Sequence, residues 1–322
     1  MPDETERASR PRQPRHRRPA ERPRIGLTAR DLAILRDVAE QRLLTAELVA
    51  WRHFPGGGGT PVEDRPTVSW AVQRRLQRLW QAGYLRRVFR PVRWGEGQAA
   101  IVYALDDLGA VALARHLGAD REDFLVRRGA PPLEALFVEH TLAVARCWAA
   151  LATACARTAN LRLVDWRGER ALKRGGLAER VRVRREESAR EVPVLPDGTA
   201  CLELDGVHRA RYFLEVDLGT ATNAVLADKV RAYAAYLRTA HYAETYGEAS
   251  CFVLWVAAGT RRLANALRTT GAAARDEPAL RGRVLGAELA AMRPGAILGP
   301  VWTVAESGER RALVRHGLLP RA

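Results

Sequence analysis

Several features are scarce in this sequence, and each absence excludes a class of protein. The chain has 4 cysteines, none in a C-x-x-C pair and all among apolar residues, which favours reduced core thiols over disulfides or a zinc site. No apolar run approaches the ~18 residues that cross a membrane, so no membrane-spanning segment is expected. The longest run, 251–258, is interpreted as a buried strand. The charged N-terminus lacks an apolar signal region, which predicts a cytoplasmic protein.

Familiar catalytic signatures are absent as well. The glycines at 56–59 are not followed by Gly-Lys-Ser/Thr, so this stretch is interpreted as a flexible loop and not as a phosphate loop. No two histidines have the His-hydrophobic-His spacing that holds a metal beside the nucleophile of a tyrosine relaxase. The tyrosines between 233 and 246 are therefore interpreted as packing residues, and no Ser/His/Asp arrangement has a supporting signature.

Acidic residues are missing from 65–95, a stretch that contains eight arginines. The whole chain carries a net charge of +15 and has a pI near 10.7. The expected partner is therefore acidic, with nucleic acid first and an anionic membrane surface second. A solvated basic face is the alternative, but uncompensated like charges destabilise a folded surface unless a polyanion is present.

A helix followed by a β-hairpin organises this basic stretch. Thr67 is a suitable N-cap, the spacing of Val72, Leu76, Leu79 and Trp80 predicts one apolar stripe, and Gly83 suits the left-handed residue that ends a helix. Strand-like runs at 84–92 and 99–105 flank a turn at 93–98, as in a recognition helix and its wing. The residues expected to contact double-stranded DNA are Arg74, Arg75 and Arg78 in the helix, and Arg86, Arg87, Arg90 and Arg93 in the wing.

The length of 322 residues favours two domains. Thr28 and Thr45 are expected to cap helices over 29–40 and 46–51, and Gly118 to end a helix over 108–117, which together with the basic unit predicts a winged helix-turn-helix. The predicted organisation is a disordered basic tail at 1–24, a winged helix-turn-helix at 25–119, a linker at 120–132, an α/β domain at 133–305, and a C-terminal tail at 306–322.

The second domain has a different pattern. A long helix over 133–157 is predicted to bury Leu136, His140, Ala143, Val144, Cys147 and Leu151, and the structure of the basic segment 167–190 is left open. The remaining elements predicted are strands at 161–166, 192–195, 199–204, 211–217, 250–257 and 301–304, and helices at 221–239 and from Thr260. The order α-β-β-β-α-β predicts an α+β or α/β fold.

Polar residues recur in this domain where strands could build a metal site. Asp197 begins a strand, Glu215 and Asp217 project to one face of the next, and Lys229 lies on the following helix. Clustered carboxylates can hold Mg²⁺ or Mn²⁺ and a lysine can orient water, and Glu139 is a further candidate ligand. Each feature also has a structural interpretation: a Pro-Asp-Gly turn, a solvent-facing Glu-Val-Asp, a snorkelling lysine, and a satisfied core histidine at His140.

The order Asp197, Glu215-x-Asp217, Lys229 on a β-β-α unit resembles a degenerate restriction-endonuclease-like core of the PD-(D/E)XK group. The usual lysine of the strand motif is replaced by Asp217, and the only candidate amine is Lys229 on the next helix. An inactive binding core would have the same pattern. The resemblance implies a nuclease-like domain, with Mg²⁺ or Mn²⁺ as cofactor if the site is active.

The chain also resembles the replication-relaxation family of plasmid and mobile-element proteins, common in actinobacteria. The resemblance covers roughly 27–258 and rests on LTARDLAILRDVAEQRLLTAELV, VQRRLQRLWQAGYLRR, YALDDLGAVAL, EHTLAVAR and FLEVDLGTATNAVLADKVRAYAAYL. It implies a winged helix acting on plasmid DNA in the cytoplasm. A DNA-binding accessory protein is the first hypothesis, and the alternatives are a metal-dependent nicking nuclease and an inactive scaffold or transcriptional regulator. A homodimer and plasmid replication or transfer proteins stay open as partners.

Overall fold

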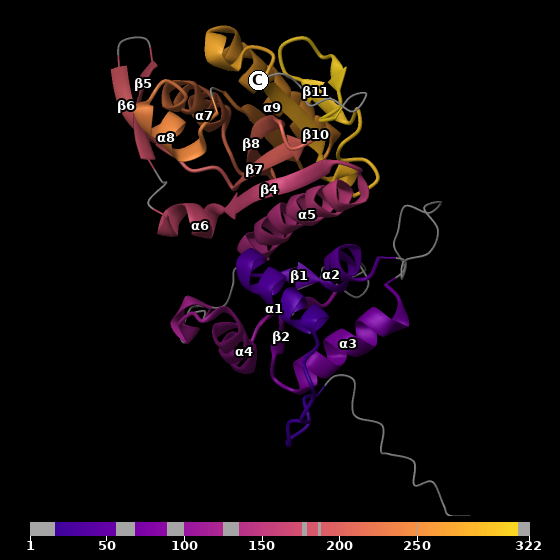
Figure 1. Ribbon diagram of the computed structural model, residues 1–322. Coiled ribbons are helices and arrows are strands. Elements are labelled where there is room, and N and C mark those ends of the chain that lie inside the picture. Colours follow the sequence, from indigo (N-terminus) through magenta and orange to yellow (C-terminus); the bar gives the residue numbers. More distant parts are fainter. Residues whose placement is uncertain are drawn as a thin grey trace, which may run out of the picture.

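Helices and strands are mixed throughout the chain, which forms two units that meet at the long helix α5 (Ala135–Arg157) (Figure 1). The computed structural model describes residues 17–55, 68–88, 100–124, 135–175, 179–185, 188–248 and 250–314. The mixed content of both element types confirms the predicted α+β class.

The N-terminal unit combines helices with a small antiparallel sheet. Its elements are α1 (Ala29–Gln41), β1 (Leu44–Thr45), α2 (Ala46–His53), α3 (Trp70–Gln81), β2 (Leu85–Val88), β3 (Val102–Leu105) and α4 (Asp107–Leu117). Strand β3 pairs with both other strands, with Leu44 opposite Tyr103 and Leu85 opposite Leu105. The order in the sheet is therefore β1-β3-β2.

Local capping explains where these helices begin and end. Thr28 forms a capping box with Asp31 at the start of α1, and the Thr45 hydroxyl accepts a hydrogen bond from the Leu48 amide at the start of α2. Gly118, at φ +63°, ends α4 in the left-handed conformation. The predicted caps of these three helices are confirmed.

The segment just before α1 packs against the N-terminal unit. The Arg18 guanidinium donates to Asp106 Oδ2 (2.7 Å) and to the Leu85 carbonyl (2.8 Å), and the Arg22 side chain lies over Gly83. Within the predicted tail at 1–24, two arginines of the described part, 17–24, therefore contact the folded unit. Gly83 has φ +87°, as predicted. The predicted N-cap of α3, Thr67, lies outside the described residues, and Ser69 occupies the N-cap position.

Within the described residues, a seven-stranded mixed sheet forms the centre of the C-terminal unit. Its strands are β4 (Leu161–Gly168), β7 (Gly198–Leu204), β8 (His208–Asp217), β9 (Phe252–Ala257), β10 (Val284–Glu288), β11 (Trp302–Val304) and β12 (Arg310–Arg311). The order is β12-β11-β10-β9-β8-β7-β4. Strand β7 pairs antiparallel with both β4 and β8, and β9 and β10 run parallel to β8. Strand β11 is antiparallel to β10, and β12 is antiparallel to β11.

Helices cover both faces of this sheet (Figure 1). Successive residues of β8 point to opposite faces, so Tyr212 and Leu214 pack in the cluster that contains α5, while Phe213 packs in the cluster that contains α7 (Asn223–Tyr236). Helix α9 (Thr260–Arg275) lies beside α7 on that second face, and α8 (Ala240–Tyr246) packs there through Tyr242. Glu215 and Asp217, which share the odd-numbered face of β8 with Phe213, therefore contact α7 and α9.

The basic segment left open by the sequence folds into α6 (Glu169–Arg174) and a hairpin of β5 (Glu179–Arg185) and β6 (Ser188–Val194). The hairpin packs on α7 through alternate valines, including Val181 and Val192, and Arg190 forms an ion pair with the buried Asp228 of α7. The 3-10 helices in the described residues are Arg121–Asp123, Pro278–Leu280 and Leu289–Ala291.

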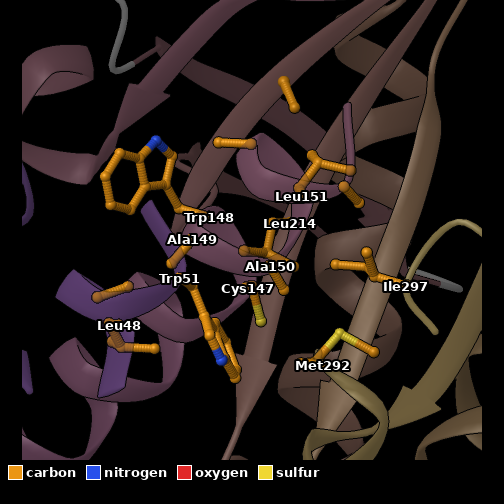
Figure 2. Packing of buried hydrophobic residues seen from close by; sticks show 14 of the residues in the cluster. Leu48, Trp51, Cys147, Trp148, Ala149, Ala150, Leu151, Leu214, Met292 and Ile297 are labelled. Carbon is orange, nitrogen blue, oxygen red and sulfur yellow. The ribbon is translucent and has the colours of Figure 1, made fainter. Parts of the chain in front are cut away.

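One hydrophobic cluster runs through both units (Figure 2). Leu48 and Trp51 of α2 pack with Cys147 and Trp148 of α5 and continue to Leu214 of β8. Two reciprocal cation–π contacts border this junction, with Arg52 over the Trp148 ring and Arg146 over the Trp51 ring, each 4.9 Å from the centroid. The N-terminal unit is therefore joined to the sheet by a continuous core.

Helix α5 is long and apolar enough to cross a membrane by length and composition alone. Its contacts with α2, β4 and β8 and its mostly buried side chains are those of a core helix. Of the predicted buried stripe, Ala143, Cys147 and Leu151 are buried and His140 and Val144 are half-buried. Leu136, in the first turn of α5, is exposed. All four cysteines are buried and free, as predicted.

Candidate functional site

Helix α3 presents one packed face and one exposed ridge. Val72, Leu76, Leu79 and Trp80 are buried, in agreement with the predicted stripe. On the opposite side Trp70, Arg74 and Arg78 follow one another at a spacing of four residues, and all three are exposed. The Arg74 guanidinium lies over the Trp70 ring, 4.7 Å from its centroid. We call Trp70, Arg74 and Arg78 the α3 ridge.

Arg75 differs from its two neighbours, because its guanidinium is held by α1. It donates to both carboxylate oxygens of Asp31 and to the Gly26 carbonyl. Asp31 is buried, and although burial opposes it, the bonds from Arg75 and Thr28 lower the pKa of this carboxyl below its usual value. Arg75 is thus tied to the structural contact between α1 and α3, and the predicted DNA contacts of Arg74 and Arg78 stay predictions on the ridge.

The hairpin after α3 is described only in part. Arg86 and Arg87 lie on β2 and are partly buried, and the Arg87 guanidinium stacks over the Trp80 ring at 3.9 Å from its centroid. Arg90 and Arg93, together with the predicted turn, lie outside the described residues. The predicted DNA contacts of Arg86, Arg87, Arg90 and Arg93 therefore stay predictions. The Arg87 guanidinium is also engaged with the aromatic core of the unit.

In the C-terminal unit, Asp197 precedes β7 and links two elements. Its Oδ2 accepts from the Val216 amide on β8 (2.7 Å), and its Oδ1 lies 3.1 Å from Nε2 of His140 on α5. The hydrogen bond to Asp197 is the main reason that the pKa of His140 is raised. His140 is therefore satisfied by a carboxylate, and Asp197 fixes α5 to the centre of the sheet.

Glu215 meets two side chains of α7. Lys229 and Tyr233, one turn apart on that helix, donate to Oε2 and Oε1 of Glu215. Burial raises the pKa of Glu215 to about 7, against the opposing effect of the lysine charge. Burial lowers the pKa of Lys229, but the charges of Glu215 and Asp197 outweigh it and raise that pKa overall. Glu215 is therefore the partner whose charge changes near neutral pH.

Asp217 shares a face with Glu215, as predicted, but belongs to a separate set of contacts. Its Oδ1 accepts from the Gly219 amide (2.9 Å) and its Oδ2 from Nε of Arg262 on α9 (2.6 Å). The guanidinium of Arg262 also donates to the Ala221 carbonyl. The strand thus brings Asp217 to the junction of β8 with α7 and α9, and Glu215 to the middle of α7.

These carboxylates do not fit a divalent metal in the arrangement that the structure has. Both oxygens of Asp197, Glu215 and Asp217 already lie against protein donors. A Mg²⁺ ion would need such oxygens as ligands at about 2.0–2.1 Å. Glu139 is exposed on α5, and no group of three or more His, Cys, Asp or Glu that could hold a metal occurs among the described residues.

Two residues that contact these carboxylates, Tyr233 and His140, were not identified from the sequence as site residues. Tyr233 lies four residues after Lys229, so their shared helix face was the signal that could have placed both near Glu215. His140 was interpreted as a core histidine, and its carboxylate partner is 57 residues away, beyond the reach of any local pattern.

Searches of curated proteins and of solved structures gave no match. The family model described as replication-relaxation matches residues 35–250. The match begins within α1 and ends two residues before the start of β9. This match covers the N-terminal unit from Leu35 onward, α5, and the sheet through β8, which is more than half of the chain. The protein therefore belongs to the replication-relaxation family.

Proposed function

We propose that this protein binds double-stranded DNA through α3, in a role connected with the replication of a plasmid or other mobile element. The order of α1, β1, α2 and α3 before the β2–β3 hairpin supports a winged helix-turn-helix with α3 as its recognition helix. Family membership supports the replication role.

The α3 ridge is the observation that carries this proposal. A helix can enter a major groove only with a face that is free of intramolecular packing, and on α3 that face bears Trp70, Arg74 and Arg78. Arginine forks bind phosphate oxygens bidentately and pair with guanine edges. Because 65–95 contains no acidic residue, no neighbour in sequence neutralises the positive charge of the ridge.

Salt dependence of duplex binding tests the proposal. We expect the logarithm of the binding constant to fall linearly with the logarithm of salt concentration, with a slope of about −0.9 for each neutralised phosphate. Replacing Arg74 and Arg78 by alanine should reduce the size of that slope by up to about two. Fluorescence anisotropy with a labelled duplex measures both quantities.

The matched control replaces two exposed arginines of the C-terminal unit, Arg162 and Arg238, by alanine. This variant loses the same charge but keeps the α3 ridge. A flat salt response of the wild-type protein would refute DNA binding of this kind. Equal loss of affinity in the two double variants would show that net charge, and not α3, determines the binding.

Metal-dependent DNA cleavage on a restriction-endonuclease-like core is the second candidate. In its favour, Asp197, Glu215 and Lys229 interact across the unit of β7, β8 and α7. The occupied carboxylate oxygens favour a polar cluster that stabilises the core, so cleavage ranks second. Nicking of supercoiled plasmid with Mn²⁺ or Mg²⁺, compared with Asp197→Ala, tests it. Nicking that the variant lacks would establish a nuclease, and intact plasmid would leave DNA binding alone.

A further inference from the structure

Trp70 is far more exposed than Trp51 and Trp80, the other tryptophans that the structure describes in the N-terminal unit. Its relative exposure is 68%, against 8% for Trp51 and 7% for Trp80. Burial of an indole stabilises the folded state by several kcal/mol, and the exposed Trp70 side chain supplies little of that stabilisation. The apolar ring is therefore accessible to a partner outside the fold.

Arg74 defines how the Trp70 ring is presented. The guanidinium lies over the ring at 4.7 Å from the centroid, so one face of the indole is occupied by a cation. Arg78 continues the same ridge one turn further along α3. The result is a flat apolar surface bordered by positive charge, and the first turn of α3 contains no acidic residue.

These properties select one chemical class of occupant. The positive border favours an anionic partner, and the flat indole gains most free energy from another flat ring. Nucleic acid supplies both, but a paired duplex hides the faces of its bases inside the stack and offers only their edges in the grooves. An unpaired base exposes the face that Trp70 can cover.

We propose that Trp70 and Arg74 form a stacking platform for an unpaired base, so that the protein prefers DNA in which a duplex adjoins an unpaired position. This inference rests on the proposed function, because it requires α3 to contact DNA. It adds the class of substrate: a melted or gapped duplex and not a fully paired one.

The test compares two DNAs of equal length and sequence, one fully paired and one with a short internal mismatch bubble. Wild-type protein should bind the bubble roughly five- to a hundredfold more tightly, the range expected for stacking of one base. Trp70→Ala should lose this preference, so that its affinities for the two DNAs become equal. Trp70→Phe, which retains a ring, should keep part of the preference.

Two controls separate this inference from the proposed function. Val207→Ala removes an apolar side chain that is 75% exposed on the C-terminal unit, and it should leave both affinities unchanged. Circular dichroism checks that Trp70→Ala is folded. Equal wild-type binding to both DNAs, or an equal loss on both in Trp70→Ala, would overturn the stacking platform while DNA binding by α3 stands. Binding to neither DNA would overturn both proposals and would favour a protein as the partner of the α3 ridge.

Discussion

Replacement of Trp51 by alanine tests whether the two units of the molecule fold as one. Trp51 lies on α2 but is buried in the cluster that extends through α5 to the central sheet. Truncation of a buried aromatic residue to alanine costs about 3–5 kcal/mol, which includes the cavity that remains. The loss of the contact with Arg146 adds to this cost by up to about 1 kcal/mol.

Urea unfolding followed by far-ultraviolet circular dichroism and by tryptophan fluorescence measures the effect. We expect one shared transition for both signals, shifted to lower urea in Trp51→Ala. Trp70→Ala is the matched control, because it removes the same side chain from an exposed position and should change stability by less than about 0.5 kcal/mol. Two separate transitions, with the later one unchanged by Trp51→Ala, would refute a continuous core and favour independent domains.

Two further predictions concern buried charges. Because burial raises the pKa of Glu215 from 4.5 to about 7, its contribution to stability is complete below pH 4.5 and is lost as the pH rises through 7. This change is on the order of 3 kcal/mol, so Glu215→Gln should flatten the pH dependence of the urea midpoint between about pH 4.5 and 7. Arg75→Ala leaves Asp31 buried without its cation and should cost about 1.5–3 kcal/mol by urea unfolding, whereas Arg74→Ala should be nearly neutral.

Local patterns predicted most helices of the fold because their signals lie within a few residues. The caps Thr28 and Thr45 and the terminal glycine Gly118 satisfy backbone groups of their own helices, so the sequence alone locates these ends. The exposure of Leu136 was not predictable in this way. Its position on the helix fits the buried stripe, but it lies near the first turn of α5 and is exposed.

Strands were harder to predict where packing from elsewhere determines them. Strand β10 contains Gly286, at which a Cβ atom would meet the side chains of Leu263 and Leu267 at under 3 Å. In sequence the glycine is typical of a strand interruption, but at this position it leaves room for the two leucine side chains of α9. In the basic hairpin, the alternation of Val181 and Val183 with arginine was the strand signal, and the high charge obscured it.

The candidate sites show the same division between local and distant information. Helical spacing separates Arg74 and Arg78 from the buried face, but only the tertiary contact with Asp31 identifies Arg75 as a structural residue. Strand alternation correctly put Glu215 and Asp217 on one face. It could not reveal that Arg262, 45 residues further along the chain, draws Asp217 into a different set of contacts.

The position of β8 in the sheet has a consequence for anyone who shortens this protein. The family match ends at residue 250, and β9, the parallel partner of β8, begins at Phe252. A fragment cut at the family boundary would turn β8 from an interior strand into a bare sheet edge, with its apolar side chains partly uncovered. Such edges recruit strands from other molecules, so the fragment should aggregate even though it retains every residue of the family match.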